Sequence, residues 1–148
     1  MDIVGALGAT LGVVLVATLA GLGWRVATGR ARGADAPGLA TIAERHGGAL
    51  GAQATLLQFS TELCTPCRAT RRMLTRLATE RDGVRHVEVD LDAHPDLARE
   101  FGILQTPTTF VLDGDGRSVA RIGGAPRMPA LLAVLAPLAE VRDDRVAA

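Results

Sequence analysis

A ten-residue stretch, FSTELCTPCR at residues 59–68, decides the fold of this 148-residue chain. It contains both cysteines of the sequence, Cys64 and Cys67, with two residues between them. The run TLLQFS at residues 55–60 is short and mostly apolar, which predicts a buried strand. After Cys67, apolar residues and arginines recur on opposite faces at helical spacing, which predicts an amphipathic helix that ends near Arg81. The cysteines are therefore expected between a buried strand and the first turn of a helix.

This position of the cysteine pair favours dithiol chemistry. The N-terminus of a helix offers unpaired N–H groups and the positive end of the helix dipole, both of which favour a thiolate at Cys64. Pro66 fits the first turn because its missing N–H is not needed there. Cys64 is expected to be the exposed nucleophile and Cys67, one turn into the helix, the resolving thiol, with a redox disulfide between the two. Both cysteines and Pro66 are therefore predicted to belong to a catalytic site.

Two other interpretations of the cysteine pair stay open. The pair can be structural only, or it can be a soft-metal clip in a non-enzymatic binding or adaptor module. A zinc site needs four ligands, and the sequence has no second cysteine pair. The histidines His46, His86 and His94 follow no zinc-finger spacing. No metal site and no bound cofactor are therefore predicted.

The segments around this unit predict an α/β domain. The tetrapeptide DGDG at residues 113–116 separates two apolar runs, which predicts a hairpin at the edge of the sheet. Pro137 is expected to kink or shorten the last helix. The predicted order is helix–strand–helix–strand–helix–strand–strand–helix, at residues 39–46, 55–60, 68–81, 84–90, 95–101, 108–112, 117–122 and 128–140. This order implies a mixed sheet, with parallel strands first and helices on both faces.

The N-terminal region predicts a transmembrane helix that anchors the chain. Ile3–Trp24 is a run of 22 residues without a charge. As a helix it would be about 33 Å long, enough to cross a bilayer core of about 30 Å. The chain is therefore divided into an anchor at residues 1–26, a linker at 27–38, the α/β domain at 39–141 and a tail at 142–148.

The arginines beside this run predict its orientation. Arg25, Arg30 and Arg32 follow the run, and no basic residue precedes it. Arginines close to a membrane span tend to stay on the cytoplasmic side. The chain is therefore expected to cross the membrane once, with its N-terminus outside and the redox domain in the cytoplasm. An extracytoplasmic redox domain is the alternative, because three arginines are a modest bias.

The charge composition excludes several kinds of function. Sixteen basic and sixteen acidic residues give no net charge, so nothing indicates a protein that binds nucleic acid by its overall field. All of the basic residues are arginines. A chain without lysine can form neither a Schiff base nor a phosphate loop of the lysine type.

The chain resembles the thioredoxin family over residues 55–135, on several motifs in the family's order. Besides the stretch quoted above, these are VEVD, FGILQTPT, DGDG and a glycine pair, at residues 87–90, 101–108, 113–116 and 123–124. The resemblance implies a thioredoxin fold, with a cis peptide bond between Thr106 and Pro107 that faces the sulfurs. It also implies that backbone groups beside Pro107 receive an extended peptide of the substrate.

Five positions depart from the family's pattern, and one of them is Thr65, which stands where the family usually has glycine. Ser60 and Leu63 stand where the family has tryptophans, which predicts a less bulky rim around the site. Gln58 replaces a buried aspartate, and His86 replaces the lysine that faces it. A glutamine cannot accept the proton of a resolving thiol, as a carboxylate can. His86 can take part in that transfer because histidine titrates near neutral pH, or it can lie partly buried beside the sheet with a hydrogen bond to Gln58 or water.

Together, these features predict a membrane-tethered thiol–disulfide oxidoreductase of the protein-disulfide reductase type. Its expected substrate is a disulfide-containing protein or a small thiol compound. Electrons are expected from an external donor, such as a thioredoxin reductase-like system. The alternative enzyme is an extracytoplasmic thioredoxin-like protein that acts in cytochrome maturation or oxidative folding.

Overall fold

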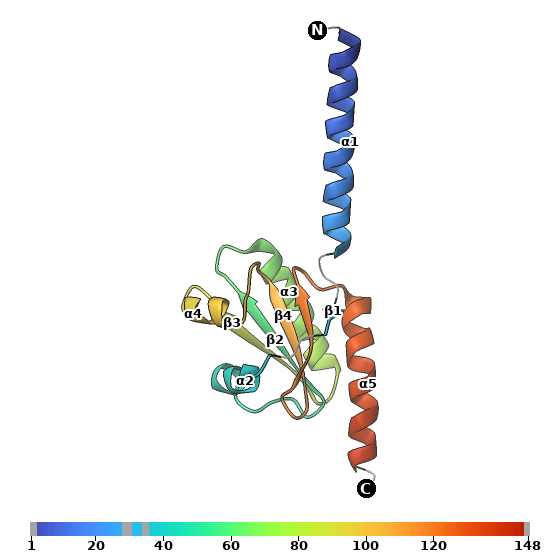
Figure 1. The fold of residues 1–148 in the computed structure, drawn as a ribbon. Coiled ribbons are helices and arrows are strands. Elements are labelled where there is room, and N and C mark those ends of the chain that lie inside the picture. The colour runs from blue at the N-terminus through green and yellow to red at the C-terminus, as the bar shows by residue number, and fades with distance from the viewer. Residues whose placement is uncertain (1–2, 28–30, 34–35, 147–148) are drawn as a thin grey trace.

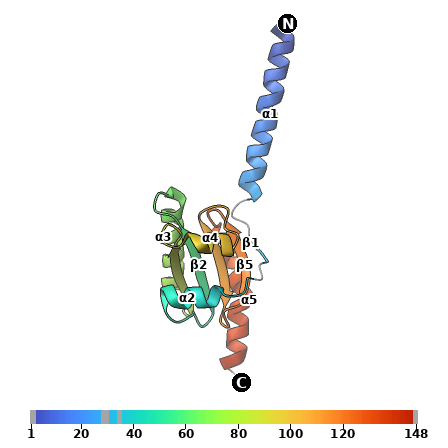
Figure 2. The ribbon, with the colours of Figure 1, turned by 60° about the vertical axis from the view of Figure 1, so that its left-hand side comes forward.

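A five-stranded mixed sheet forms the centre of the domain. The computed structural model describes residues 3–27, 31–33 and 36–146. The strands are β1 (Ala31–Arg32), β2 (Ala54–Ser60), β3 (Val84–Asp90), β4 (Thr108–Asp113) and β5 (Ser118–Gly123). The helices are α1 (Ile3–Ala27), α2 (Leu39–Gly47), α3 (Thr65–Glu80), α4 (Pro95–Glu100) and α5 (Met128–Val146). The strand order is β1-β5-β4-β2-β3, with helices on both faces of the sheet (Figures 1 and 2).

β2 is the central strand of the fold, and all seven of its residues are buried. It pairs in parallel with β3 and antiparallel with β4. Because side chains alternate along a strand, Leu57 and Phe59 enter one core and Leu56 enters the other. A strand covered on both faces needs apolar residues at successive positions, which is why residues 55–60 form a nearly continuous apolar run.

The two cores lie on opposite faces of the sheet. α2 and α4 cover one face, where their side chains pack around Phe59 and Phe110. α3 and α5 cover the other face, around Leu56 and Ile122. The helix residues that enter these cores are Leu39, Ile42 and Ala43 of α2, Leu97 of α4, Leu74 and Leu77 of α3, and Leu131 and Leu135 of α5. Both faces of the sheet are thereby removed from water, which stabilises the fold.

The predicted α/β architecture with helices on both faces is confirmed, and its last helix is longer than expected. The eight predicted helices and strands of the domain are present, mostly with ends within three residues of the prediction. α5 continues through Pro137 to Val146, so of the two effects expected of this proline, a kink or a shorter helix, the shortening does not occur. A proline inside a helix removes one backbone hydrogen bond, and α5 tolerates that loss while its buried leucines hold it against the sheet.

Two residues of the expected linker form an edge strand. Ala31 and Arg32 pair antiparallel with Ile122 and Arg121 of β5. Ala31 also packs against the core cluster that contains Ile122. The segment that leads into the domain is therefore attached to the sheet only four positions after the last residue of α1.

α1 is a 25-residue helix that stands apart from the sheet (Figures 1 and 2). Its large apolar side chains with a described position, such as Leu11 and Val13, are exposed. In the part of the chain that the structure describes, no helix is both long enough and apolar enough to cross a membrane.

Candidate active site

The cysteine pair begins α3 directly after the central strand. β2 ends at Ser60, and Cys64 is the N-cap residue of α3. The N–H of Cys67 donates a hydrogen bond to Cys64 Sγ at 3.2 Å. Pro66 lies in the first turn, where its missing N–H removes no helical hydrogen bond. The structure thus places both cysteines between the strand and the first helical turn, as the sequence predicts.

The two cysteines form a disulfide and differ in exposure. Their Cα atoms are 5.2 Å apart. Cys67 exposes only 2% of its surface, whereas Cys64 is partly exposed. A partner in solution can therefore approach Cys64, while Cys67 lies behind it in the helix.

The loop that contains Pro107 lies beside the cysteine loop. The peptide bond between Thr106 and Pro107 is cis, as the family resemblance implies. The hydroxyl groups of Thr61 and Thr106 share a hydrogen bond of 3.3 Å, which joins the two loops. The N–H of Gly124, directly after the last residue of β5, donates to the carbonyl oxygen of Pro107 at 2.7 Å and so supports the same loop.

The sequence analysis missed two contacts that hold the cysteine loop in place. One is the hydrogen bond from Thr61 to the Pro107 loop, described above. The other is the hydrogen bond from the N–H of Glu62 to Asp92 Oδ2, at 2.7 Å. Both contacts cross between segments far apart in the chain, so no local pattern of residues could have indicated them.

Ser60 and Leu63 differ in exposure, although the sequence placed both on the rim of the site. Leu63 is 94% exposed, next to Cys64. Ser60 is buried, and its hydroxyl donates to Glu88 Oε1 at 2.6 Å. Glu88 also forms an ion pair with Arg71 of α3. The small side chain of Ser60 therefore lies inside the domain, where it joins β2 to β3, and it adds no bulk to the rim.

Gln58 and His86 form a chain of hydrogen bonds behind Cys67. Gln58 is fully buried, and its Nε2 donates to the carbonyl oxygen of Cys67 at 3.1 Å. Its Oε1 lies 3.2 Å from His86 Nε2, and His86 Nδ1 lies 3.0 Å from Thr75 Oγ1. Because an amide oxygen can only accept, His86 Nε2 carries the proton and Nδ1 accepts from the Thr75 hydroxyl.

His86 is therefore a partly buried hydrogen-bond partner of Gln58, which is one of the two roles that the sequence allows. Burial lowers the pKa of His86 below its ordinary value of 6.5. The carboxylate of Glu88 opposes this shift and the guanidinium of Arg71 adds to it. The neutral ring that results is the form that can both donate to Gln58 and accept from Thr75.

We expect His86 to make the stability of the domain depend on pH. The pKa of His86 is lowered on folding, so the unfolded chain binds the proton more readily than the folded chain. The contribution of His86 to the free energy of unfolding is therefore complete above about pH 6.5, and it is lost as the pH falls below that value. In urea titrations at about pH 7.5 and about pH 5, the native protein should lose more of its free energy of unfolding than a His86→Gln variant. An equal loss in both proteins would contradict this role, since their other titrating groups are the same.

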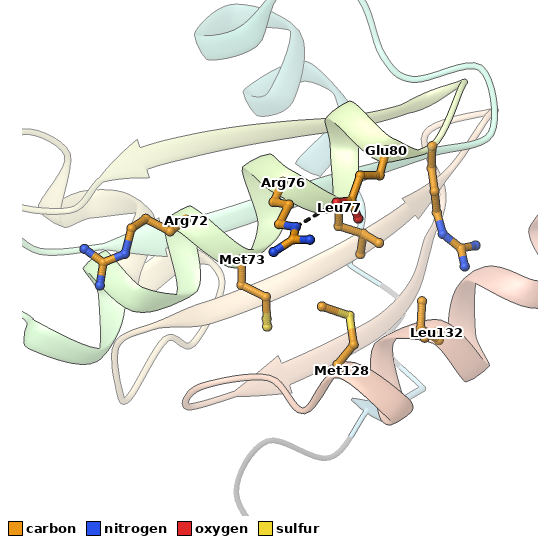
Figure 3. A pocket seen from close by; sticks show the side chains of 8 residues that line it. Arg72, Met73, Arg76, Leu77, Glu80, Met128 and Leu132 are labelled. Carbon is orange, nitrogen blue, oxygen red and sulfur yellow. Dashed lines mark hydrogen bonds and ion pairs between the residues drawn. The ribbon is translucent and has the colours of Figure 1, made fainter.

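A groove on the helical surface lies between α3 and α5 (Figure 3). Figure 3 shows Met73 and Met128 facing one another across it, and an ion pair between Arg76 and Glu80 at its edge. Its lining residues are Arg72, Met73, Arg76, Leu77, Glu80, Arg81, Met128 and Leu132. Neither cysteine and no residue of the Pro107 loop is among them, so the disulfide lies outside this groove.

Over the described ranges of the chain, no three His, Cys, Asp or Glu side chains lie close enough together to hold a metal ion.

The disulfide lies at the N-terminus of a helix that follows the central strand of a mixed sheet, and it lies beside a cis-proline loop. This arrangement defines a dithiol protein of the thioredoxin fold. The thioredoxin family model matches residues 44–136, and the chain belongs to this family. The predicted family and the predicted thioredoxin fold of the domain are thereby confirmed, whereas the predicted transmembrane helix is not.

Individual relatives agree with this assignment. The thioredoxin of Mycolicibacterium smegmatis is 38% identical over 80 residues, which are 52% of this chain and 70% of the relative. The bifunctional thioredoxin reductase/thioredoxin of Mycobacterium leprae is 36% identical over 78 residues, 52% of this chain but only 17% of that protein. The oxidised form of mitochondrial thioredoxin 3 from Saccharomyces cerevisiae has a similar structure, with a TM-score of 0.53 and 27% identity over 65% of this chain and 89% of that one.

Proposed function

We propose that this protein is a membrane-tethered thiol–disulfide oxidoreductase of the protein-disulfide reductase type. The observation that carries the proposal is a disulfide in which a partly exposed Cys64 precedes a buried Cys67 in the first turn of α3. A pair of this kind can exchange with an external disulfide at one sulfur while the second sulfur stays protected. Membership of the thioredoxin family supports the same activity.

The reaction proceeds in two exchanges. In the reduced protein, the Cys64 thiolate attacks one sulfur of a partner disulfide, which forms a mixed disulfide and releases one partner thiolate. The Cys67 thiolate then attacks Cys64 Sγ, which forms the Cys64–Cys67 disulfide and releases the second partner thiolate. Two electrons pass to the partner in total, and its released thiolates take up protons from the Cys67 thiol or from water. A dithiol donor, such as a thioredoxin reductase-like system, restores the reduced pair by the reverse exchange.

The residues around the cysteine pair have different roles in this reaction. The N–H of Cys67, which already points at Cys64 Sγ, stabilises a thiolate there. Gln58 positions the first turn of α3 through the Cys67 carbonyl, but its amide can take no proton. The proton of the Cys67 thiol therefore passes to water or to the departing partner thiolate. Pro107 and Thr106 border the surface where a partner peptide would lie.

Turnover separates this proposal from the soft-metal clip. With a dithiol donor in excess, the full-length protein should reduce many equivalents of insulin. A metal clip would instead bind one Cu(I) or Zn(II) per cysteine pair and leave insulin intact. A stoichiometric metal complex without any insulin reduction would overturn the oxidoreductase proposal.

The membrane tether is the second part of the proposal. Its support comes from the sequence, because no described helix has both the length and the apolar character that a membrane span needs. Ile3–Trp24 contains no charged residue, and a helix of these 22 residues would be about 33 Å long, against a bilayer core of about 30 Å. The exposed apolar side chains along α1 would contact lipid. Arg25, Arg30 and Arg32 favour a cytoplasmic redox domain, in which a reducing environment keeps the cysteines as thiols.

The side of the membrane is tested by labelling intact cells. The Cys67→Ser variant keeps Cys64 as a thiol, so a membrane-impermeant maleimide should label Cys64 only after the cells are lysed. A labelled Cys64 in intact cells would place the redox domain outside. The protein would then act with the extracytoplasmic systems, in cytochrome maturation or oxidative folding.

A further inference from the structure

The register of the sheet shows at which end the chain enters the domain. β1 runs antiparallel to β5, with Ala31 opposite Ile122 and Arg32 opposite Arg121. β5 ends at Gly123, one residue after Ile122. β1 therefore begins at the end of the sheet where β5 finishes, and it runs away from that end.

The active site lies at this same end of the sheet. Gly123 at the end of β5 pairs with Thr108 at the start of β4, and Thr108 pairs with Phe59 near the end of β2. The cysteine loop follows β2, and the Pro107 loop precedes β4. The start of β1 and the two active-site loops thus share one edge of the domain, and α1 extends from the domain on that side (Figures 1 and 2).

The short segment between α1 and β1 limits how far α1 can lie from the sheet. Ala27, the last residue of α1, is four positions from Ala31, which allows a separation of about 14 Å at most. A strand of seven residues such as β2 is about 23 Å long. Ala31 is level with Gln58 through the pairs with Ile122 and Thr109, so it lies two residues from the active-site end of β2 and four from the opposite end, near Ala52.

The exposed apolar side chains of the domain gather at the active-site end. Among the described residues outside α1, the large exposed apolar side chains are Leu63, Leu104 and Met128. Leu63 precedes Cys64 and Leu104 precedes the Pro107 loop, and they are 94% and 95% exposed. Met128 begins α5, shortly after the end of β5.

We propose that the dithiol is presented to the membrane surface, and that its partner is a disulfide held close to the bilayer in another membrane-anchored protein. The inference rests on the proposed tether and adds the class of substrate. The short connection through β1 keeps Cys64 near the surface, so a disulfide beside a membrane span is within reach and one far from the bilayer is not. Leu63 and Leu104 would contact apolar residues beside the partner cysteines. The chemistry is the pair of exchanges described above.

The placement is tested with the full-length protein in phosphatidylcholine nanodiscs. A fluorophore is attached to Cys64 in a Cys67→Ser variant. In a matched control it is attached through Ala52→Cys in a variant whose own cysteines are both serine. Lipids with a quencher on the headgroup should remove most of the fluorescence at Cys64 and little at position 52. Equal quenching at both positions, or stronger quenching at position 52, would overturn the inference.

The partner class is tested with two disulfide-bearing transmembrane peptides. One carries its disulfide directly beside the span, and the other carries it behind a rigid helical spacer of about 30 residues, or about 45 Å. The Cys67→Ser variant should form a mixed disulfide with the first peptide at least about tenfold faster. A long Gly/Ser insertion after Ala27, ahead of β1, should remove this preference. Equal rates with both peptides for the native spacing would contradict the inference.

Two control measurements separate this inference from the proposed function. Flotation of the full-length protein with vesicles tests the tether, and reduction of insulin in solution tests the redox activity. If both hold and the two peptides react equally, only the membrane-facing placement is wrong. If the protein does not float with vesicles, the tether is wrong and the placement falls with it.

Discussion

Cys64→Ser is expected to abolish the reduction of insulin, with a loss of more than about 10³-fold in turnover. A serine hydroxyl is not ionised near neutral pH and does not exchange with disulfides. Cys67 cannot replace it, because only 2% of its surface is exposed and it lies behind Cys64 in α3. The measurement is the rate of insulin reduction by the full-length protein with a dithiol donor.

Cys67→Ser is the matched control for this prediction. It leaves the first exchange possible and removes the second, so mixed disulfides should accumulate at Cys64 while turnover stops. In the reduced protein with both cysteines, iodoacetamide near neutral pH should modify Cys64 faster than Cys67, as followed by mass spectrometry of the peptides. Faster modification of Cys67, or mixed disulfides trapped by Cys64→Ser, would reverse the two roles.

Phe59→Ala is expected to destabilise the domain by about 3–5 kcal/mol. Phe59 is fully buried in the central strand, and its ring lies 6.0 Å from that of Phe101 and 5.8 Å from that of Phe110. Removing the ring leaves a cavity among residues of β2, β4 and the end of α4, which cannot all close at once. The free energy of unfolding in urea measures the effect.

Leu104→Ala is the control for the loss of a large apolar side chain. Leu104 is 95% exposed, so its removal should change the free energy of unfolding by no more than about 0.5 kcal/mol. A similar cost for both substitutions would show that Phe59 does not occupy the core described here. If Phe59→Ala leaves too little folded protein for a titration, Phe59→Leu should give a smaller loss of the same sign.

The fold could be predicted because its elements have strong local patterns. The buried run at residues 55–60 has the composition of a strand covered on both faces, and the helix after Cys67 has a clear apolar face. β1 could not be predicted in this way. Its two residues carry no periodicity, and they form a strand only because β5 offers an unpaired edge beside them. The length of α5 likewise depends on packing against the sheet, which outweighs the local effect of Pro137.

The candidate site was predictable where it depends on spacing along the chain. Two cysteines separated by two residues at the start of a helix can meet within one turn, and they form the disulfide. The hydrogen-bond partners of the site could not be predicted from the sequence. Thr75 meets His86 because α3 packs on β3, and Asp92 meets the N–H of Glu62 because two loops converge. Such contacts are set by the tertiary structure, so a single sequence carries no local signal for them.

The central claim is that the Cys64–Cys67 pair transfers two electrons to a partner disulfide. A single-turnover experiment tests it most directly. The fully reduced, full-length protein is mixed with excess oxidised insulin, and both proteins are alkylated and analysed by mass spectrometry over time. We expect one insulin disulfide to be reduced for each Cys64–Cys67 disulfide that forms, with the same time course. Cysteines that stay reduced while insulin remains intact, or that oxidise without any loss of insulin disulfides, would contradict the claim.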